Sequence, residues 1–245
     1  MTKPIVNRSF PDKKALITNR GDITYTEMLK NIQQYADLFS SKSYTKVAIY
    51  AENSPEWIYA CYAALQNNCI AIPIDFLASV EDVAYILDDC TPDLLFISSA
   101  MQEAYSKVAE KIQKEPEVLV FENVIPDNTA NESKWLGPES DDTTAVIIYT
   151  SGTTGSPKGV MLSYTNLREN IRAVIECGIY SPDRQVMIFL PLHHIFPLLG
   201  SMMVSFYVGT TIAMAPSMQS SDLMKTFAQN KVSVFIGVPR LYELM

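Results

Sequence analysis

Residues 149–159 read YTSGTTGSPKG, a segment rich in glycine and hydroxyl side chains that follows an apolar run. Glycine lets backbone N–H groups approach an anion through conformations that a Cβ opposes. The glycines expected to turn through positive φ are Gly152, Gly155 and Gly159. Further donors come from the hydroxyls of Thr150, Ser151, Thr153, Thr154 and Ser156 and from the ammonium group of Lys158. The segment therefore predicts a loop that binds nucleotide phosphates.

The spacing of this loop differs from that of a Walker A loop. In a Walker A loop the lysine follows a glycine directly and leads into a helix. Lys158 instead follows Pro157 and precedes Gly159, so we expect it in a loop of restricted φ between a strand and a helix. The spacing argues against a P-loop kinase.

A second block, residues 190–197 (LPLHHIFP), accompanies the phosphate loop, and three weaker blocks are AENSPEW at 51–57, AIPID at 71–75 and GVP at 237–239. Together the blocks resemble the adenylate-forming superfamily, whose members include acyl-CoA synthetases, and they stand in that family's order. The doubled histidine is similar to that of the fatty-acyl branch, so the resemblance is closest to long-chain fatty acid–CoA ligases.

The resemblance implies the site residues. The phosphate cradle is Thr150, Ser151, Gly152, Thr153, Thr154, Gly155 and Lys158. Thr153 is the expected Mg²⁺ ligand, and His194 is expected to pack and gate near the acyl carboxylate. Two blander interpretations stay open: a Gly/Ser/Thr turn with a solvated lysine, and a buried histidine with one backbone partner.

The implied reaction has two steps. A carboxylate attacks the α-phosphate of Mg-ATP, pyrophosphate leaves, and a thiol such as that of coenzyme A captures the acyl-adenylate. Donors and positive charge around the departing pyrophosphate suit this chemistry. The expected small-molecule partners are a fatty acid, ATP and coenzyme A.

The substrate class depends on residues 185–221, which contain no Asp, Glu, Lys or Arg. This segment is a candidate wall for an apolar acyl pocket. Its candidate lining residues are Met187, Phe189, Ile195, Phe196, Leu199, Met202, Met203 and Phe206. Ordinary core packing is the alternative for most of them. An aryl-acid or amino-acid adenylating enzyme and a non-catalytic nucleotide-binding regulator remain alternative functions.

Net charge and hydropathy restrict the partners and the cellular location that we expect for this protein. The net charge of −8 argues against nucleic-acid binding over the whole surface. Prolines and glycines interrupt the apolar segment 185–221, so no transmembrane span is expected, while peripheral membrane contact stays compatible. No export signal is visible, and a cytoplasmic location with reduced cysteines is expected. The Arg20-Gly21-Asp22 triplet suits a hairpin turn better than an adhesion motif.

Alternating apolar runs and helical patterns predict an α/β fold with mostly parallel sheets flanked by helices. Ser54 before Pro55 predicts one helix start, and Ser79 with Asp82 predicts another. The resemblance implies one lobe over 46–180 and a second made of 1–45 plus 181–245. It also implies that residues 1–245 are an incomplete N-terminal AMP-binding domain. The C-terminal domain with its catalytic lysine is then absent, and this fragment alone is expected to be inactive.

Overall fold

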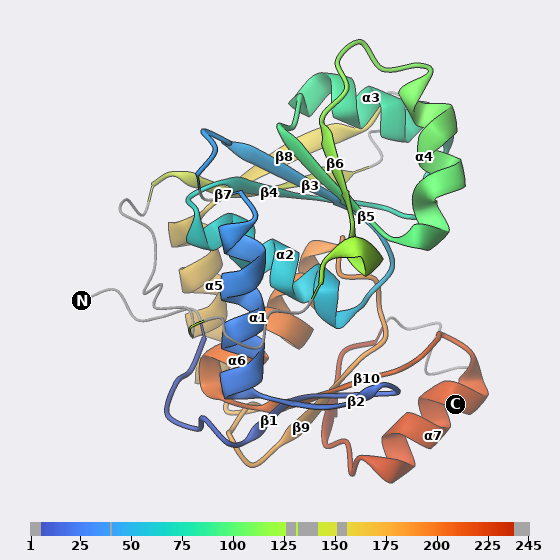
Figure 1. Ribbon diagram of the computed structural model, residues 1–245. Helices are drawn as coiled ribbons and strands as arrows, with labels where there is room; N and C mark the ends of the chain where they lie inside the picture. The colour runs from blue at the N-terminus through green and yellow to red at the C-terminus, as the bar shows by residue number, and fades with distance from the viewer. Residues whose placement is uncertain (1–5, 40, 126–130, 132–141, 151–155, 238–245) are drawn as a thin grey trace. The chain divides into compact units, whose positions relative to one another are not determined.

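A computed structural model describes residues 6–39, 41–125, 131, 142–150 and 156–237. The chain divides into two compact units. The first unit comprises Met1–Leu29, Lys134–Gly137 and Asn166–Met245, and the second comprises Lys30–Ser133 and Pro138–Thr165. Each unit contains one sheet, as Figure 1 shows. The predicted lobe boundaries at 46 and 180 stay predictions.

The second unit contains a six-stranded sheet in the order β6-β5-β3-β4-β7-β8. Its strands are β3 (Lys46–Tyr50), β4 (Ile70–Ile74), β5 (Leu94–Ile97), β6 (Glu117–Val120), β7 (Thr144–Thr150) and β8 (Lys158–Ser163). All neighbours are parallel except β7 and β8, which are antiparallel. The inner strands are apolar on both faces because helices cover both faces.

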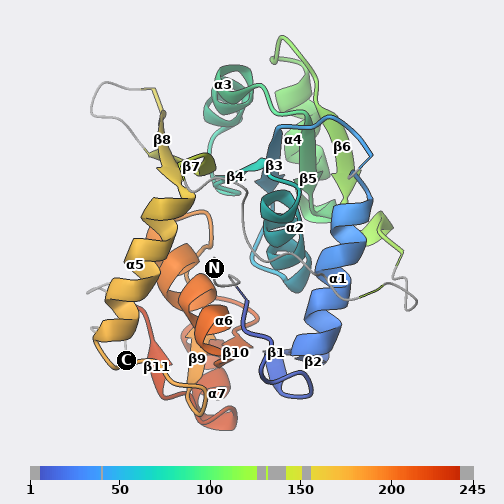
Figure 2. The same cartoon turned by 90° about the vertical axis from the view of Figure 1, so that its left-hand side faces the viewer.

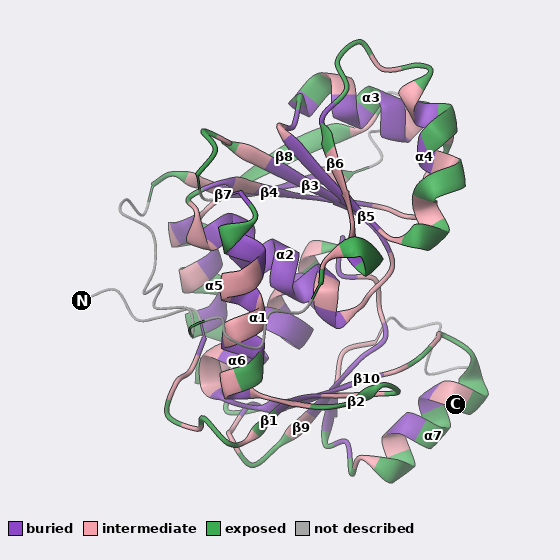
Figure 3. Ribbon diagram, in the orientation of Figure 1, coloured by how far each residue is buried: buried purple, intermediate pink, exposed green. Residues whose placement is uncertain are grey.

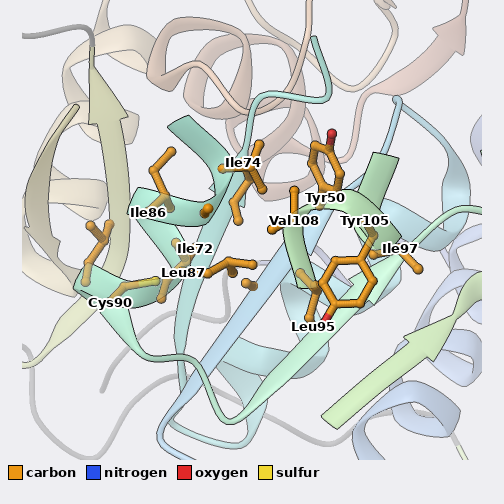
Figure 4. Packing of buried hydrophobic residues seen from close by; sticks show 14 residues of the cluster. Tyr50, Ile72, Ile74, Ile86, Leu87, Cys90, Leu95, Ile97, Tyr105 and Val108 are labelled. Carbon is orange, nitrogen blue, oxygen red and sulfur yellow. The ribbon is translucent and has the colours of Figure 1, made fainter. Parts of the chain in front are cut away.

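Helices α3 (Val80–Cys90) and α4 (Gln102–Ala109) cover one face of this sheet, and α2 (Pro55–Gln66) covers the other, as Figures 1 and 2 show. Figure 4 shows how side chains of α3 and α4 pack on those of β3, β4 and β5. Helix α2 is buried along nearly its whole length, whereas α4 exposes its outer side (Figure 3). The sheet is therefore sandwiched between two helical layers.

Both predicted helix starts are confirmed. The Ser54 hydroxyl accepts a hydrogen bond from the Trp57 N–H at 3.1 Å, and Pro55 occupies the first helical position of α2. The Ser79 hydroxyl accepts from the Asp82 N–H at 3.1 Å at the start of α3. Each serine satisfies an N–H group that the helix itself leaves unpaired.

The first unit contains a five-stranded sheet in the order β11-β9-β10-β1-β2. Its strands are β1 (Lys14–Thr18), β2 (Gly21–Thr24), β9 (Gln185–Ile188), β10 (Thr211–Met214) and β11 (Val234–Phe235). Only β1 and β2 are antiparallel. Arg20, Gly21 and Asp22 lie at their hairpin, so the predicted turn is confirmed.

Helix α7 (Ser220–Gln229) packs on β9 and β10 through an apolar cluster that includes Leu223. The helix after His194 begins as a π-helix, Pro197–Met203, and continues as α6 (Val204–Val208). Helices α1 (Tyr25–Asp37) and α5 (Tyr164–Glu176) and the short 3₁₀ turns Ser99–Met101 and Phe121–Asn123 complete the described elements.

The predicted α/β class with mostly parallel sheets is confirmed. A helix follows the predicted phosphate loop as expected, but the strand β8, which was not predicted from the sequence, lies between the loop and α5. Residues of β8 are mostly exposed, so they lack the in–out alternation that marks a half-buried strand. Among the residues that the structure describes, no helix is long and apolar enough to cross a bilayer.

Candidate active site

The described ends of the predicted phosphate-binding segment pair as two antiparallel strands. Thr150 ends β7, Lys158 begins β8, and the two are Cα partners in the antiparallel pair. Both residues are exposed, so the hydroxyl and the ammonium group are open to a ligand. Residues paired across two strands present their side chains on the same face of the sheet. The hairpin therefore brings these two predicted site residues together.

The other predicted cradle residues lie outside the described part of the chain. They are Ser151, Gly152, Thr153, Thr154 and Gly155. Their roles, including Thr153 as a Mg²⁺ ligand, stay predictions. In the part that is described, no group of three or more His, Cys, Asp or Glu side chains could hold a metal ion.

Lys158 differs from the expectation in its backbone. It was predicted to lie in a loop of restricted φ, but it opens a strand that pairs with β7. The ladder of β8 fixes the backbone at Lys158, so its ammonium group extends from a defined position. A site group on a strand is held more precisely than one on a loop.

Gly159 also differs from the expectation. Its φ lies outside the left-handed range, in contrast to Gly21, Gly178 and Gly209. A Cβ on Gly159 would come 2.9 Å from Ile147 Cγ2 and 3.2 Å from Tyr149 Cζ. This position therefore requires glycine because side chains of β7 pack closely over it, and not because the backbone turns around a phosphate.

Tyr149 links the hairpin to α3. Its hydroxyl donates a hydrogen bond of 2.5 Å to Asp89 Oδ2. Burial first, and then this hydrogen bond, raises the pKa of Tyr149 above its usual range, so the hydroxyl stays a donor at neutral pH. Sequence reasoning missed this pair because Asp89 is an ordinary exposed helix acid and lies 60 residues from Tyr149 in the chain.

The carboxyl ends of β3, β4 and β5 lie at the same end of the sheet as Thr150, because these strands and β7 are parallel. Ligands of open α/β sheets bind at this end. The residues that follow the three strands include Glu52, Asp75 and Ser98, and Ser98 Oγ donates to Glu52 Oε2 at 2.7 Å. Acidic groups disfavour a polyphosphate, so the hairpin is the better phosphate site at this end.

The two histidines differ in exposure. His193 is buried, whereas His194 is exposed. Their Nε2 atoms lie 3.2 Å apart, and one of them must be unprotonated to accept the hydrogen bond. The His194 N–H donates to the Pro191 carbonyl, and the His194 carbonyl accepts from the Leu198 N–H. The buried-histidine alternative thus describes His193, and His194 is the histidine open to a ligand.

The apolar segment 185–221 contributes largely to the core of the first unit. Five of its candidate lining residues are at most 5% exposed: Met187, Phe189, Met202, Met203 and Phe206. Met187 and Phe189 pack in the cluster that contains Leu223 of α7, and Phe206 meets Tyr25 edge-on. Phe196, by contrast, is 59% exposed. Core packing accounts for those five residues, and Ile195, Phe196 and Leu199 are the ones with accessible surface.

Comparisons with known proteins bear on this site. Malonate–CoA ligase ACSF3, mitochondrial, of Bos taurus is 25% identical over 249 residues, which cover 96% of this chain and 42% of that protein. Long-chain-fatty-acid–CoA ligase ACSBG2 of Rattus norvegicus is 29% identical over 224 residues, which cover 81% of this chain and 34% of that protein. The chain thus spans less than half the length of these curated relatives.

Solved structures share the fold. ATP-bound MatB from Rhodopseudomonas palustris superposes with a TM-score of 0.83 at 23% identity, over 97% of this chain and 48% of that chain. o-Succinylbenzoate CoA synthetase (MenE) from Bacillus subtilis, in complex with OSB-AMP, gives 0.82 at 23% identity, over 97% of this chain and 61% of that one. The model of the family "AMP-binding enzyme" matches residues 5–245. The chain therefore belongs to the AMP-binding enzymes of the adenylate-forming superfamily.

Proposed function

We propose that the protein activates a carboxylic acid with ATP to an acyl-adenylate and transfers the acyl group to coenzyme A, with release of pyrophosphate and AMP. The observation that carries the proposal is the register of Thr150 with Lys158 at the carboxyl end of the sheet. This pair stands at the base of the family's phosphate loop in a chain that matches the family model over 5–245.

In this mechanism Lys158 acts electrostatically. Its ammonium group extends from the hairpin base and offsets the negative charge of the departing pyrophosphate. Thr150 donates a hydroxyl hydrogen bond beside it. His194, the exposed histidine, is proposed to contact the carboxylate of the acid. Thr153 is the proposed Mg²⁺ ligand, and a bound Mg²⁺ would offset negative charge on the phosphates.

We propose a fatty acid, with a long chain favoured, as the carboxylic acid. The absence of Lys and Arg from 185–221 supports an acid without a second charge, because a dicarboxylate would require a cation near that group. The names of the relatives include both a malonate ligase and a long-chain ligase. Malonate is therefore the competing substrate that the experiment must include.

The test measures carboxylate-dependent exchange of labelled pyrophosphate into ATP, and it uses the complete encoded protein. The acids are fatty acids of graded length, malonate, an aryl acid and amino acids. Exchange with long fatty acids, reduced about a hundredfold or more in Lys158→Ala and partly kept in Lys158→Arg, supports the proposal. Exchange with malonate alone would identify malonate, and not a fatty acid, as the substrate. ATP binding without exchange for any acid would favour the alternative function, a non-catalytic nucleotide-binding regulator.

His194 has its own test in the same assay. The His194→Ala change is expected to raise the KM for the acid more than the KM for ATP, because the residue is assigned to the acyl side. His193→Ala provides the matched comparison. His193 is buried, so its loss should lower thermal stability more than acid affinity.

A further inference from the structure

Tyr149 of β7 contacts the helical layer at the end of the β7–β8 hairpin, and Ile147 of the same strand also packs against that layer. Its hydroxyl lies 2.5 Å from Asp89 Oδ2 on the last turn of α3. Its ring lies over Gly159, where a Cβ would come 3.2 Å from Cζ and 3.4 Å from Cε1. Tyr149 thus contacts β8 with its ring and α3 with its hydroxyl, next to the Thr150–Lys158 pair.

The last turn of α3 is itself held in place. Lys46 Nζ of β3 donates to the Cys90 carbonyl at 2.7 Å, and the Gln113 N–H donates to Asp88 Oδ1 at 2.8 Å. The Thr91 N–H closes the helix on the Leu87 carbonyl at 2.8 Å, with Thr91 in the left-handed region at φ 44°. These contacts fix the end of α3, so Asp89 is a defined acceptor.

The hairpin depends on such a contact because of its place in the sheet. β8 lies at the sheet edge and pairs with β7 alone among the described strands. Its first four residues, including Lys158, are exposed, so little packing restrains them. An edge strand has one neighbour and lacks the second row of hydrogen bonds that holds an inner strand, so a contact from β7 to α3 adds restraint to this end of the sheet.

We propose that Tyr149 and Asp89 are positioning residues for the triphosphate of ATP: their hydrogen bond holds the hairpin base on α3 and thereby sets the place of Thr150 and Lys158. This inference rests on the proposed function. It assigns a functional role to two side chains that do not themselves contact the nucleotide. The physical reason is that a shift of about 1 Å in a charged group at a reacting phosphate costs up to about a hundredfold in rate.

The experiment removes the hydrogen bond and leaves the ring. Tyr149→Phe keeps the packing over Gly159, and Asp89→Ala removes the acceptor. The matched control is Tyr105→Phe, which removes another tyrosine hydroxyl of the same unit, 3.4 Å from Glu115 Oε1 and on α4. Asp89→Asn keeps a carbonyl oxygen as acceptor and serves as the conservative variant.

The readouts are the Kd of ATP and of AMP by calorimetry, kcat and KM in pyrophosphate exchange, and the thermal midpoint. Tyr149→Phe and Asp89→Ala are expected to weaken ATP binding about tenfold and AMP binding about twofold or less, because only ATP carries the β- and γ-phosphates. Asp89→Asn should recover part of the loss. The Tyr149→Phe, Asp89→Ala double variant should lose no more than either single variant.

A merely structural hydrogen bond gives a different result. Tyr149→Phe would then lower the thermal midpoint, as is expected of Tyr105→Phe, and change ATP and AMP affinity equally, which overturns the proposal. Should Tyr149→Phe fail to fold, Asp89→Ala and Asp89→Asn are compared instead. The deciding quantity is again the loss of ATP affinity relative to the loss of AMP affinity.

The outcomes also separate this inference from the proposed function. If the complete encoded protein shows no exchange, but Tyr149→Phe weakens ATP binding more than AMP binding, the ligase proposal fails and the positioning role stands. If the wild type exchanges and the variants match Tyr105→Phe, the positioning role fails and the ligase proposal stands. A wild type that neither exchanges nor binds ATP overturns both.

Discussion

The ring of Tyr149 lies across the backbone of Gly159, and a Cβ on Gly159 would stand 3.2 Å from Tyr149 Cζ. The two residues are Cα partners in the β7–β8 pair. The glycine at the end of the phosphate motif is thus explained by the packing of two strands. This contact leads to a first prediction.

Gly159→Ala is expected to destabilise the protein. Overpacking against Ile147 Cγ2 at 2.9 Å costs about 1–3 kcal/mol. The gain from a less flexible unfolded chain is only about 0.4–1 kcal/mol, so the free energy of unfolding should fall. Urea denaturation measures it, with the exposed Ser156→Ala as control. If Gly159→Ala were as stable as the wild type, the side chains of β7 would be able to make room for a Cβ, and the packing explanation for this glycine would be wrong.

A second prediction concerns Gly200 in the π-helix. A Cβ there would come 2.2 Å from Ile236 Cδ1, whereas the next atom, Ile236 Cγ1, would be 3.7 Å away. The Ile236 side chain must shift to make room, and because Cδ1 is its flexible end, Gly200→Ala is expected to lower the thermal midpoint less than Gly159→Ala does. The double variant Gly200→Ala, Ile236→Val lacks the clashing Cδ1 and should recover most of the loss.

The control for this cycle is Ile236→Val alone, which is expected to cost about 0.5–1.5 kcal/mol from the lost methyl group. A coupling between the two changes of about 0.5 kcal/mol or more is the expected sign of direct contact. Strict additivity of the two changes would count against the contact.

A third prediction concerns the start of α2. Ser54→Ala removes the acceptor of the Trp57 N–H and should lower the free energy of unfolding by about 1 kcal/mol. Ser54→Asn keeps a capping oxygen and should restore most of that loss. Denaturant unfolding of the three proteins checks the order wild type, Asn, Ala. An alanine variant as stable as the asparagine variant would rule out a capping role.

A fourth prediction concerns thiol reactivity. Burial raises the pKa of Cys61 to about 12, that of Cys69 to about 11 and that of Cys90 to about 12, so at pH 8 almost none of these three is the reactive thiolate. Cys177 is exposed. In the native protein, iodoacetamide should modify Cys177 alone on the fast time scale, as peptide mass spectrometry can show.

The control for this prediction is Cys177→Ser, which should abolish the fast phase. Denaturation in urea should make the other three cysteines react together, because unfolding removes their burial. Fast labelling of Cys61 in the folded protein would contradict its position in α2, where it has no exposed surface.

Local features of the chain were readable from the sequence because their chemistry is local. Ser54 and Ser79 cap helices through N–H groups three residues away. Asn68 adopts a left-handed conformation at φ 54° after α2, which asparagine tolerates better than most residues. The continuous apolar runs gave the parallel strands, since strands covered on both faces need no polar side chain.

Exposed or long-range features were not readable. β8 carries apolar residues on the surface, with Met161 63% exposed, so its pattern does not indicate a strand. The π-helical start of the helix after His194 depends on how its buried face packs and is not indicated by the periodicity of the sequence. The sequence could not show which of two adjacent histidines is buried.

The sequence by itself determined the family and the α/β class and located the predicted phosphate loop, because glycine, hydroxyl and lysine side chains at fixed spacing form a local pattern. Only the tertiary structure decided that Lys158 opens a strand opposite Thr150, and that Tyr149 reaches Asp89. The physical reason is that strand pairing and side-chain contacts between distant residues depend on how the layers pack, which no local pattern specifies.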